Sequence, residues 1–255
     1  MTFLSSHARR LAYLVSCFAL PSTLLSQSSA TLTSVERSIT GAVDSHNAEA
    51  LSLLERLVNI NSGTLNLAGV RQVGDVLRAQ FDALGFTTRW VDGAPFQRSG
   101  HLVAEHPGPG QKILLIGHLD TVFEPDNPFQ KFQRINDSTA KGPGIIDMKG
   151  GDVILLFALR ALKDAGALDK MNITVVFNGD EEEAGTPIEA ARKTLIDAAK
   201  GASAALGFED GAGDPKTAVV SRRSAGSWTL RTTGTPAHSG QIFKPEVGAG
   251  AVYEA

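Results

Sequence analysis

Two uninterrupted apolar runs constrain the fold of this chain more than any other feature of its sequence. Residues 113–117 read ILLIG and residues 172–177 read NITVVF, and charged side chains follow each run closely. Apolar runs without polar alternation are typical of strands buried on both faces, as in mostly parallel sheets. Parallel strands must be joined by crossover segments, so helices are expected between them.

Helix-like segments lie where such crossovers are needed. Apolar residues recur at helical spacing over 149–165 and 188–199, and residues 204–208 form a third short strand-like run. The order strand, helix, strand, helix, strand predicts an α/β fold with a mostly parallel sheet and flanking helices. In such folds a site lies at the carboxyl ends of the strands.

The segments on either side predict further elements. An amphipathic helix over 49–60 would bury one face, made of Leu51, Leu54, Leu57 and Val58. A second helix, ending at Gly85, would bury Val70, Val73, Val76, Leu77 and Phe81. Short strands are expected over 86–91 and 100–105, and polar–apolar alternation over 219–233 predicts antiparallel strands in a second domain.

The first 30 residues predict a signal peptide. Arg9 and Arg10 precede a short apolar run, and small residues at 28–30 offer a cleavage site. The run is too short for a stable membrane span. Export to the periplasm or the medium is therefore expected, with a lipid anchor on Cys17 as the lesser alternative.

Composition narrows the function classes. The formal net charge is −3 and no basic cluster extends beyond Arg222-Arg223, so a nucleic-acid surface is not supported. The only cysteine, Cys17, lies in the segment expected to be removed. A metal site must then use His, Asp and Glu, which favours a hydrolytic zinc, manganese or cobalt site over a zinc finger or an iron–sulfur cluster.

Charged residues gather at the predicted strand and loop ends. They are His118, Asp120, Asp147, Glu181, Glu182 and Glu209. Taken singly, each has an ordinary explanation as a surface histidine, a helix-capping aspartate or a solvated acid. Together they would crowd at one sheet edge, which is unfavourable unless protons or metal ions neutralise the carboxylates. A pair of divalent ions does so directly, as in two-metal hydrolases, and Asp120 would accept the ring N–H of His118.

Three motifs resemble one family. They are His118-Leu119-Asp120-Thr121-Val122, the segment GPGIIDMKGG over 142–151, and Asn178-Gly179-Asp180-Glu181-Glu182. In order and spacing they resemble the zinc metallopeptidases that include glutamate carboxypeptidase, acetylornithine deacetylase, succinyl-diaminopimelate desuccinylase and aminoacylase, with the carboxypeptidase G branch nearest. The resemblance implies a catalytic domain over 31–215, the start of a lid or dimerisation domain over 216–255, and a homodimer of the full-length protein.

The resemblance also implies a role for each residue. Asp147 matches a carboxylate that bridges two zinc ions, and the peptide bond after it would be cis. His118 and Glu209 match further ligands of one ion, and Glu182 matches a ligand of the other. Glu181 matches the general base, and Asp120 matches the partner of His118. His238 matches a histidine that reaches the neighbouring subunit's site and stabilises the oxyanion. Cobalt or manganese would suit the same ligands.

The same resemblance bears on substrate and completeness. Glu209, rather than an aspartate, favours a peptide or N-acyl amino acid substrate from which a free amino acid is released, although the neighbouring Asp210 leaves that alignment open. Family members complete the second metal site with a histidine far downstream, so this chain is expected to be truncated. The alternative is a non-catalytic remnant that keeps partial metal binding and acts as a binding or dimerisation module. Nucleotide binding and serine hydrolysis fit the sequence poorly. A phosphate-binding loop would need a glycine where Asp147 stands, and a serine hydrolase would need a G-x-S-x-G elbow, which the sequence does not contain.

Overall fold

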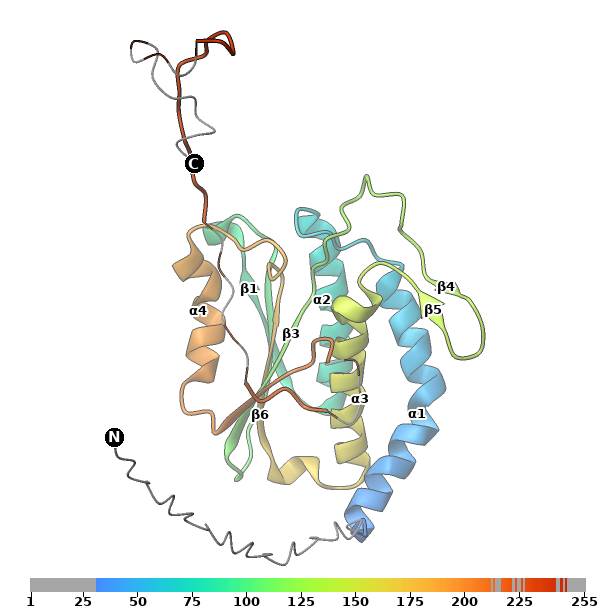
Figure 1. The fold of residues 1–255 in the computed structure, drawn as a ribbon. Helices are drawn as coiled ribbons and strands as arrows, with labels where there is room; N and C mark the ends of the chain where they lie inside the picture. Colours follow the sequence, from blue (N-terminus) through green and yellow to red (C-terminus); the bar gives the residue numbers. More distant parts are fainter. Residues whose placement is uncertain are drawn as a thin grey trace, which may run out of the picture.

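A five-stranded sheet lies between two helical layers (Figure 1). In this computed structural model the described residues are 31–211, 213, 217–221, 223, 226, 228–241, 244 and 246. In spatial order the strands are β1 (Thr87–Asp92), β2 (Gly100–His106), β6 (Asn172–Asn178), β3 (Lys112–His118) and β7 (Ala204–Gly207). One face of the sheet carries the helices α1 (Ser34–Val58), α2 (Leu67–Leu84) and α3 (Gly150–Asp164), and the other carries α4 (Ile188–Ala199).

The pairing of the strands confirms the α/β class and shows a mixed sheet. Strands β6, β3 and β7 are parallel, whereas β1 pairs with β2, and β2 with β6, in antiparallel fashion. Antiparallel neighbours need only a short connection, so β1 and β2 join the sheet without a crossover helix. In the parallel part, His118 at the end of β3 is the register partner of Asn178 at the end of β6. The loops that follow these two residues therefore leave the sheet at the same edge.

Shorter elements fill the connections. Along the chain, the connection from β3 to α3 contains a small two-stranded sheet of β4 (Gln133–Arg134) and β5 (Ala140–Lys141). A helical turn, η2 (Ile145–Lys149), leads directly into α3. The turns η1 (Ala94–Phe96) and η3 (Leu168–Lys170) precede β2 and β6.

Helix α2 agrees with the prediction from its apolar spacing. It buries Val70, Val73, Val76, Leu77 and Phe81 against the sheet. It ends at Gly85, whose φ of 93° lies in the left-handed region that glycine adopts without a steric penalty.

Helix α1 is longer than predicted and is rotated relative to the expected face. It begins at Ser34, where Thr33 and Glu36 form a reciprocal capping box. Leu57 is buried as expected, but Leu51 is 37% exposed and Leu53 is buried instead. The prediction for Leu51 was wrong because that side of α1 faces the β4–β5 hairpin, where Leu51 lines a shallow hollow with residues 132–140.

The strands predicted over 219–233 are not formed in the described part of that segment. Its described residues adopt no paired strand, and Val220 and Trp228 are 95% and 83% exposed. Polar–apolar alternation favours a strand only where a partner strand takes up its backbone hydrogen bonds and a core covers its apolar face. Neither lies alongside the described residues of this segment.

Two predictions concern membranes and export. Within the described residues, none of the helices combines the length and the apolar character that a bilayer crossing requires. The predicted signal peptide over 1–30 lies outside the described residues.

Leu57 and Leu51 allow a paired test of the α1 packing. Leu57→Ala is expected to lower the free energy of unfolding by about 2–5 kcal/mol, because the fully buried side chain would leave a cavity. Leu51→Ala is expected to lower it by less than about 1 kcal/mol, since that side chain is partly exposed. Urea denaturation of both variants measures the difference, and equal losses would contradict the observed face of α1.

Candidate metal centre

His118 is the buried residue around which this site is built. Its ring is 1% exposed, at the carboxyl end of β3. Nδ1 lies 3.0 Å from the main-chain oxygen of Asp120, which can only accept, so Nδ1 carries the proton. The Asp120 carboxylate, predicted as the acceptor, lies farther from Nδ1, at 3.5 Å. With Nδ1 held in this way, Nε2 faces the carboxylates outside the strand.

Asp147 and Glu209 meet His118 Nε2 from two other segments. Asp147 Oδ1 lies 3.0 Å from Nε2, and Glu209 Oε1, after β7, lies 3.2 Å from it. One donor atom from each of the three residues lies within 4.8 Å of the others, which makes this a group that could hold a metal ion. One imidazole with carboxylates is a ligand set suited to zinc and to similar divalent ions.

The glycine-rich turn before Asp147 lets the backbone pass close to β3. Gly144 has a φ of 65°, and a Cβ on it would lie 2.3 Å from Thr121 Cγ2. A side chain at this position would therefore collide with the loop after β3. The peptide bond between Asp147 and Met148 is cis, as the resemblance implies. Met148 lies beneath His118, and its Sδ accepts a hydrogen bond from the His118 backbone N–H at 3.2 Å.

The carboxylates give this edge of the sheet a strongly negative field. Burial of the ring lowers the pKa of His118, but the carboxylates of Asp120 and Glu209 outweigh this effect and raise the pKa to about 12. The cluster thus favours a positive charge at Nε2, which either a proton or a cation between the side chains supplies. A donor set of this kind fits a divalent metal ion.

Glu181 and Glu182 lie on the loop after β6 and reach the site from the opposite side. The Asp120 carboxylate accepts hydrogen bonds from their backbone N–H groups, at 3.0 and 3.1 Å. Burial raises the pKa of Glu181, and nearby carboxylates add to the increase. Burial, together with Asp147, raises the pKa of Glu182 to about 7. The Glu181 side chain lines a cavity of about 270 Å³ together with His118 and Glu209.

Besides Asp120 and Glu181, two further predicted residues lie outside the three-residue group, namely Glu182 and His238. Glu182 contributes no atom to the group found among the described residues. His238 is exposed, and its Nδ1 accepts a hydrogen bond from the nearby Gly240 N–H at 3.2 Å. Figure 1 draws the described residues around His238 outside the sheet and its helices.

Sequence reasoning missed two buried residues beside the cluster. Thr64 donates its hydroxyl to Asp120 Oδ2 at 2.7 Å, from the loop after α1. Asp152, in the first turn of α3, is fully buried, and neither of its oxygens has a hydrogen-bond partner among the described residues. Burial raises the pKa of Asp152 well above its ordinary value, against the opposing effects of His118 and Lys149. Only the position of Asp152, five residues after Asp147, could have suggested its proximity to the site.

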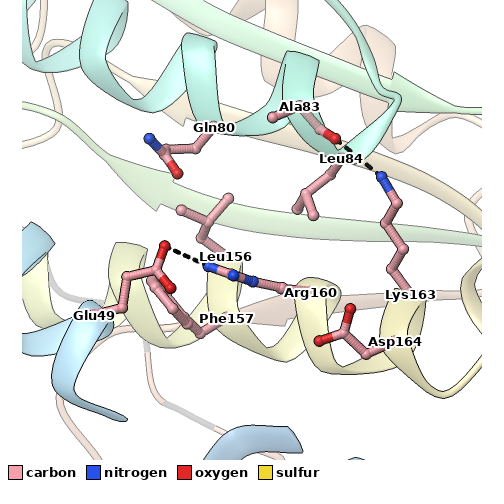
Figure 2. A pocket seen from close by; sticks show the side chains of 9 residues that line it. All are labelled: Glu49, Gln80, Ala83, Leu84, Leu156, Phe157, Arg160, Lys163 and Asp164. Carbon is pink, nitrogen blue, oxygen red and sulfur yellow. Dashed lines mark hydrogen bonds and ion pairs between the residues drawn. The ribbon is translucent and has the colours of Figure 1, made fainter. Parts of the chain in front are cut away.

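A second hollow, of about 310 Å³, lies between α1, α2 and α3 (Figure 2). Its charged side chains are already paired. Arg160 contacts Glu49 at 2.6 Å, and Lys163 donates to the main-chain oxygen of Ala83 at 2.9 Å. These contacts join the three helices, and none of the candidate metal ligands lines the hollow.

Comparisons with known proteins agree on one group. Residues 114–224 match the family described as Peptidase family M20/M25/M40. The chain is 35% identical over 207 residues to carboxypeptidase G2 of Pseudomonas sp. (strain RS-16), across 80% of this chain and 48% of that protein. This chain therefore spans about half the length of that relative.

Solved structures show the same fold at lower identity. Human carnosine dipeptidase 1 superimposes with a TM-score of 0.56 at 19% identity, covering 67% of this chain and 40% of the dipeptidase. The M20 family metallo-carboxypeptidase Sso-CP2 from Sulfolobus solfataricus gives a TM-score of 0.52 at 20% identity, covering 64% and 38%. At such identities the likeness concerns the fold.

The raised pKa of Glu182 leads to a test by pH. A folded-state pKa of about 7, above the ordinary 4.5, means that stability is fully present below pH 4.5 and is lost as pH rises through 7. In chelator-treated protein, Glu182→Gln is therefore expected to gain stability relative to the parent between pH 4.5 and 8. Because the side chain is partly exposed, we expect a gain of about 1 kcal/mol.

Urea denaturation at several pH values measures this gain. The exposed Glu55 on α1 provides the matched control, and Glu55→Gln is expected to follow the parent at every pH. Parallel stability profiles of Glu182→Gln and the parent would contradict the raised pKa of Glu182.

Proposed function

The chain carries a domain of the peptidase family M20/M25/M40, and from this premise we propose that it is a metal-dependent hydrolase of amide bonds. The observation that carries the proposal is the meeting of His118, Asp147 and Glu209 at one edge of the sheet. The bond cleaved would join an amino acid with a free carboxylate to a peptide or to an acyl group. The name of the 35% identical relative, a carboxypeptidase, supports this substrate class.

The donor set suits two divalent ions. His118, Asp147 and Glu209 would hold one ion, and Asp147 and Glu182 would contribute to holding a second. Zinc fits these ligands best, and cobalt or manganese would use the same ones. When bound, such ions polarise the scissile carbonyl and lower the pKa of water.

Glu181 is proposed as the group that moves the proton. It takes a proton from the attacking water and returns it to the nitrogen of the leaving amino acid. Burial and neighbouring carboxylates raise its pKa, which brings the carboxylate nearer to the strength that a general base needs. Asp120 acts through the others, because it accepts the N–H of Glu181 and lies beside His118.

A second candidate function is a metal-binding or dimerisation module without turnover. The observation in its favour is that the group among the described residues has three members, which suffice for one ion. In that case the chain would bind one ion at His118, Asp147 and Glu209. His238 as an oxyanion-stabilising residue, homodimerisation, the domain boundary near 216 and export through residues 1–30 stay predictions.

Metal content and hydrolysis separate the two candidates. The zinc-loaded chain is expected to hydrolyse N-acyl amino acids and C-terminal glutamyl peptides. Glu181→Gln is expected to lower kcat by about 10²–10⁴-fold, because it removes the proton carrier, while the bound metal measured by mass spectrometry stays unchanged. Asp147→Asn is expected to lose metal as well as turnover.

The possible outcomes assign the function. Turnover that depends on Glu181 would exclude the module. One bound ion without turnover would favour the module over the hydrolase. Metal content at trace level in the parent chain would contradict both candidates.

A further inference from the structure

His101 is a fully buried histidine that the proposed function does not use. It lies in β2, next to β6, and its side chain is 0% exposed. Buried histidines are uncommon unless their nitrogens are satisfied, so the partners of both ring atoms define its role. Those partners come from the two segments that border the loop carrying Glu181 and Glu182.

The hydrogen bonds of His101 determine its tautomer. Gly179 N–H lies 3.2 Å from Nδ1, and because a backbone N–H only donates, Nδ1 must accept. Nε2 lies 3.0 Å from the main-chain oxygen of Ala191 in α4, which only accepts, so Nε2 carries the proton. Only the neutral ring satisfies both bonds. Burial lowers the pKa of His101, outweighing the opposing effect of Asp180, in agreement with a neutral ring.

The same ring also holds the far end of the loop. It stacks on Phe96, with ring centroids 4.9 Å apart and planes within 11°. The main-chain oxygen of Phe96 accepts the Thr186 N–H at 3.0 Å, and a Cβ on Gly185 would lie 2.4 Å from that oxygen. His101 therefore contacts the first residue of the loop and the turn that receives its last residues.

Asp180 and Arg192 tie the loop to α4. The buried Asp180 carboxylate accepts from Arg192 at 2.7 Å and from the Gly185 N–H at 2.9 Å. On the other side, the Asp120 carboxylate accepts the N–H groups of Glu181 and Glu182. The two glutamates thus project from a backbone that is held from both sides, with His101 at its entry.

We propose that His101 is a positioning residue that fixes the backbone of the Gly179–Glu182 loop, and through it the carboxylates of Glu181 and Glu182. The essential contact is the acceptance of the Gly179 N–H by Nδ1. This inference rests on the proposed function only in its effect on turnover, since the anchoring of the loop is independent of catalysis.

The test compares variants that keep or remove this acceptor. His101→Phe keeps the ring on Phe96 but has no acceptor, and the amide oxygen of His101→Asn lies where Nδ1 does. His101→Phe removes both hydrogen bonds of the ring, and loss of the one from the Gly179 N–H is expected to speed exchange of that amide by about tenfold. His101→Asn is expected to exchange close to the parent rate.

The kinetic arm uses the zinc-loaded chain. His101→Phe is expected to lower kcat by about tenfold or more with a smaller change in KM, since displacement of Glu181 affects proton transfer more than substrate binding. His101→Asn is expected to recover most of that loss. His106→Phe is the matched control: His106 lies in the same strand, contacts Met171 and Phe86, and is expected to change neither kcat nor Gly179 exchange.

Each outcome bears on the proposal. If His101→Phe does not fold, as judged by circular dichroism, His101→Gln serves instead, because its longer amide leaves the Nδ1 position without an acceptor. Parent-like exchange in the acceptor-less variant, or equal loss in His101→Asn, overturns the proposal. An inactive parent chain contradicts the proposed function alone, and the exchange comparison then still decides the anchoring. Faster exchange with unchanged kcat in an active chain overturns the positioning role.

Discussion

The buried carboxylate of Asp120 is the contact on which the rest of the site depends. It accepts the hydroxyl of Thr64 and the backbone N–H groups of Glu181 and Glu182, and it lies 3.5 Å from the ring of His118. Segments that are far apart in the sequence thus converge on one side chain. Burial raises the pKa of Asp120, but hydrogen bonds and the neighbouring imidazole outweigh this effect and lower it. The Asp120 carboxylate therefore stays ionised.

The electrostatics of the site follow from the parallel pairing of β3 with β6 and β7. That pairing brings acidic strand ends to one edge, where like charges repel unless a proton or a cation lies between them. Burial also raises the pKa of Asp152 beside this edge, which favours its protonated form. Lys149 lies beneath the site, but its ammonium donates to the main-chain oxygens of Leu57 and Ile60 at the end of α1. Lys149 therefore joins α1 to the site, and it does not pair with the carboxylates that could hold a metal ion.

Much of the fold could be predicted from residue patterns, and the errors have physical causes. The bounds of α4 agree with the prediction from its apolar spacing, and α2 buries the predicted residues. Leu51 was misplaced because periodicity defines a face but not the neighbour that covers it. The described residues of 219–233 form no strand for a related reason, since a strand forms only against a partner. The acceptor of the His118 Nδ1–H also differs from the prediction. The main-chain oxygen of Asp120, and not its carboxylate, accepts this N–H, because both groups of Asp120 lie within reach of the ring.

Residue patterns alone predict the α/β class and which acidic residues follow each strand, because apolar runs and the charges after them are local properties of the chain. The packing of strands and loops brings His118, Asp147 and Glu209 within 4.8 Å, while Glu182 contributes no atom to that group and His238 is exposed. It also placed His101, Thr64 and Asp152 around the site. None of these three lies in a motif, since their partners are set by strand register and helix packing, which bring together atoms that no local pattern connects.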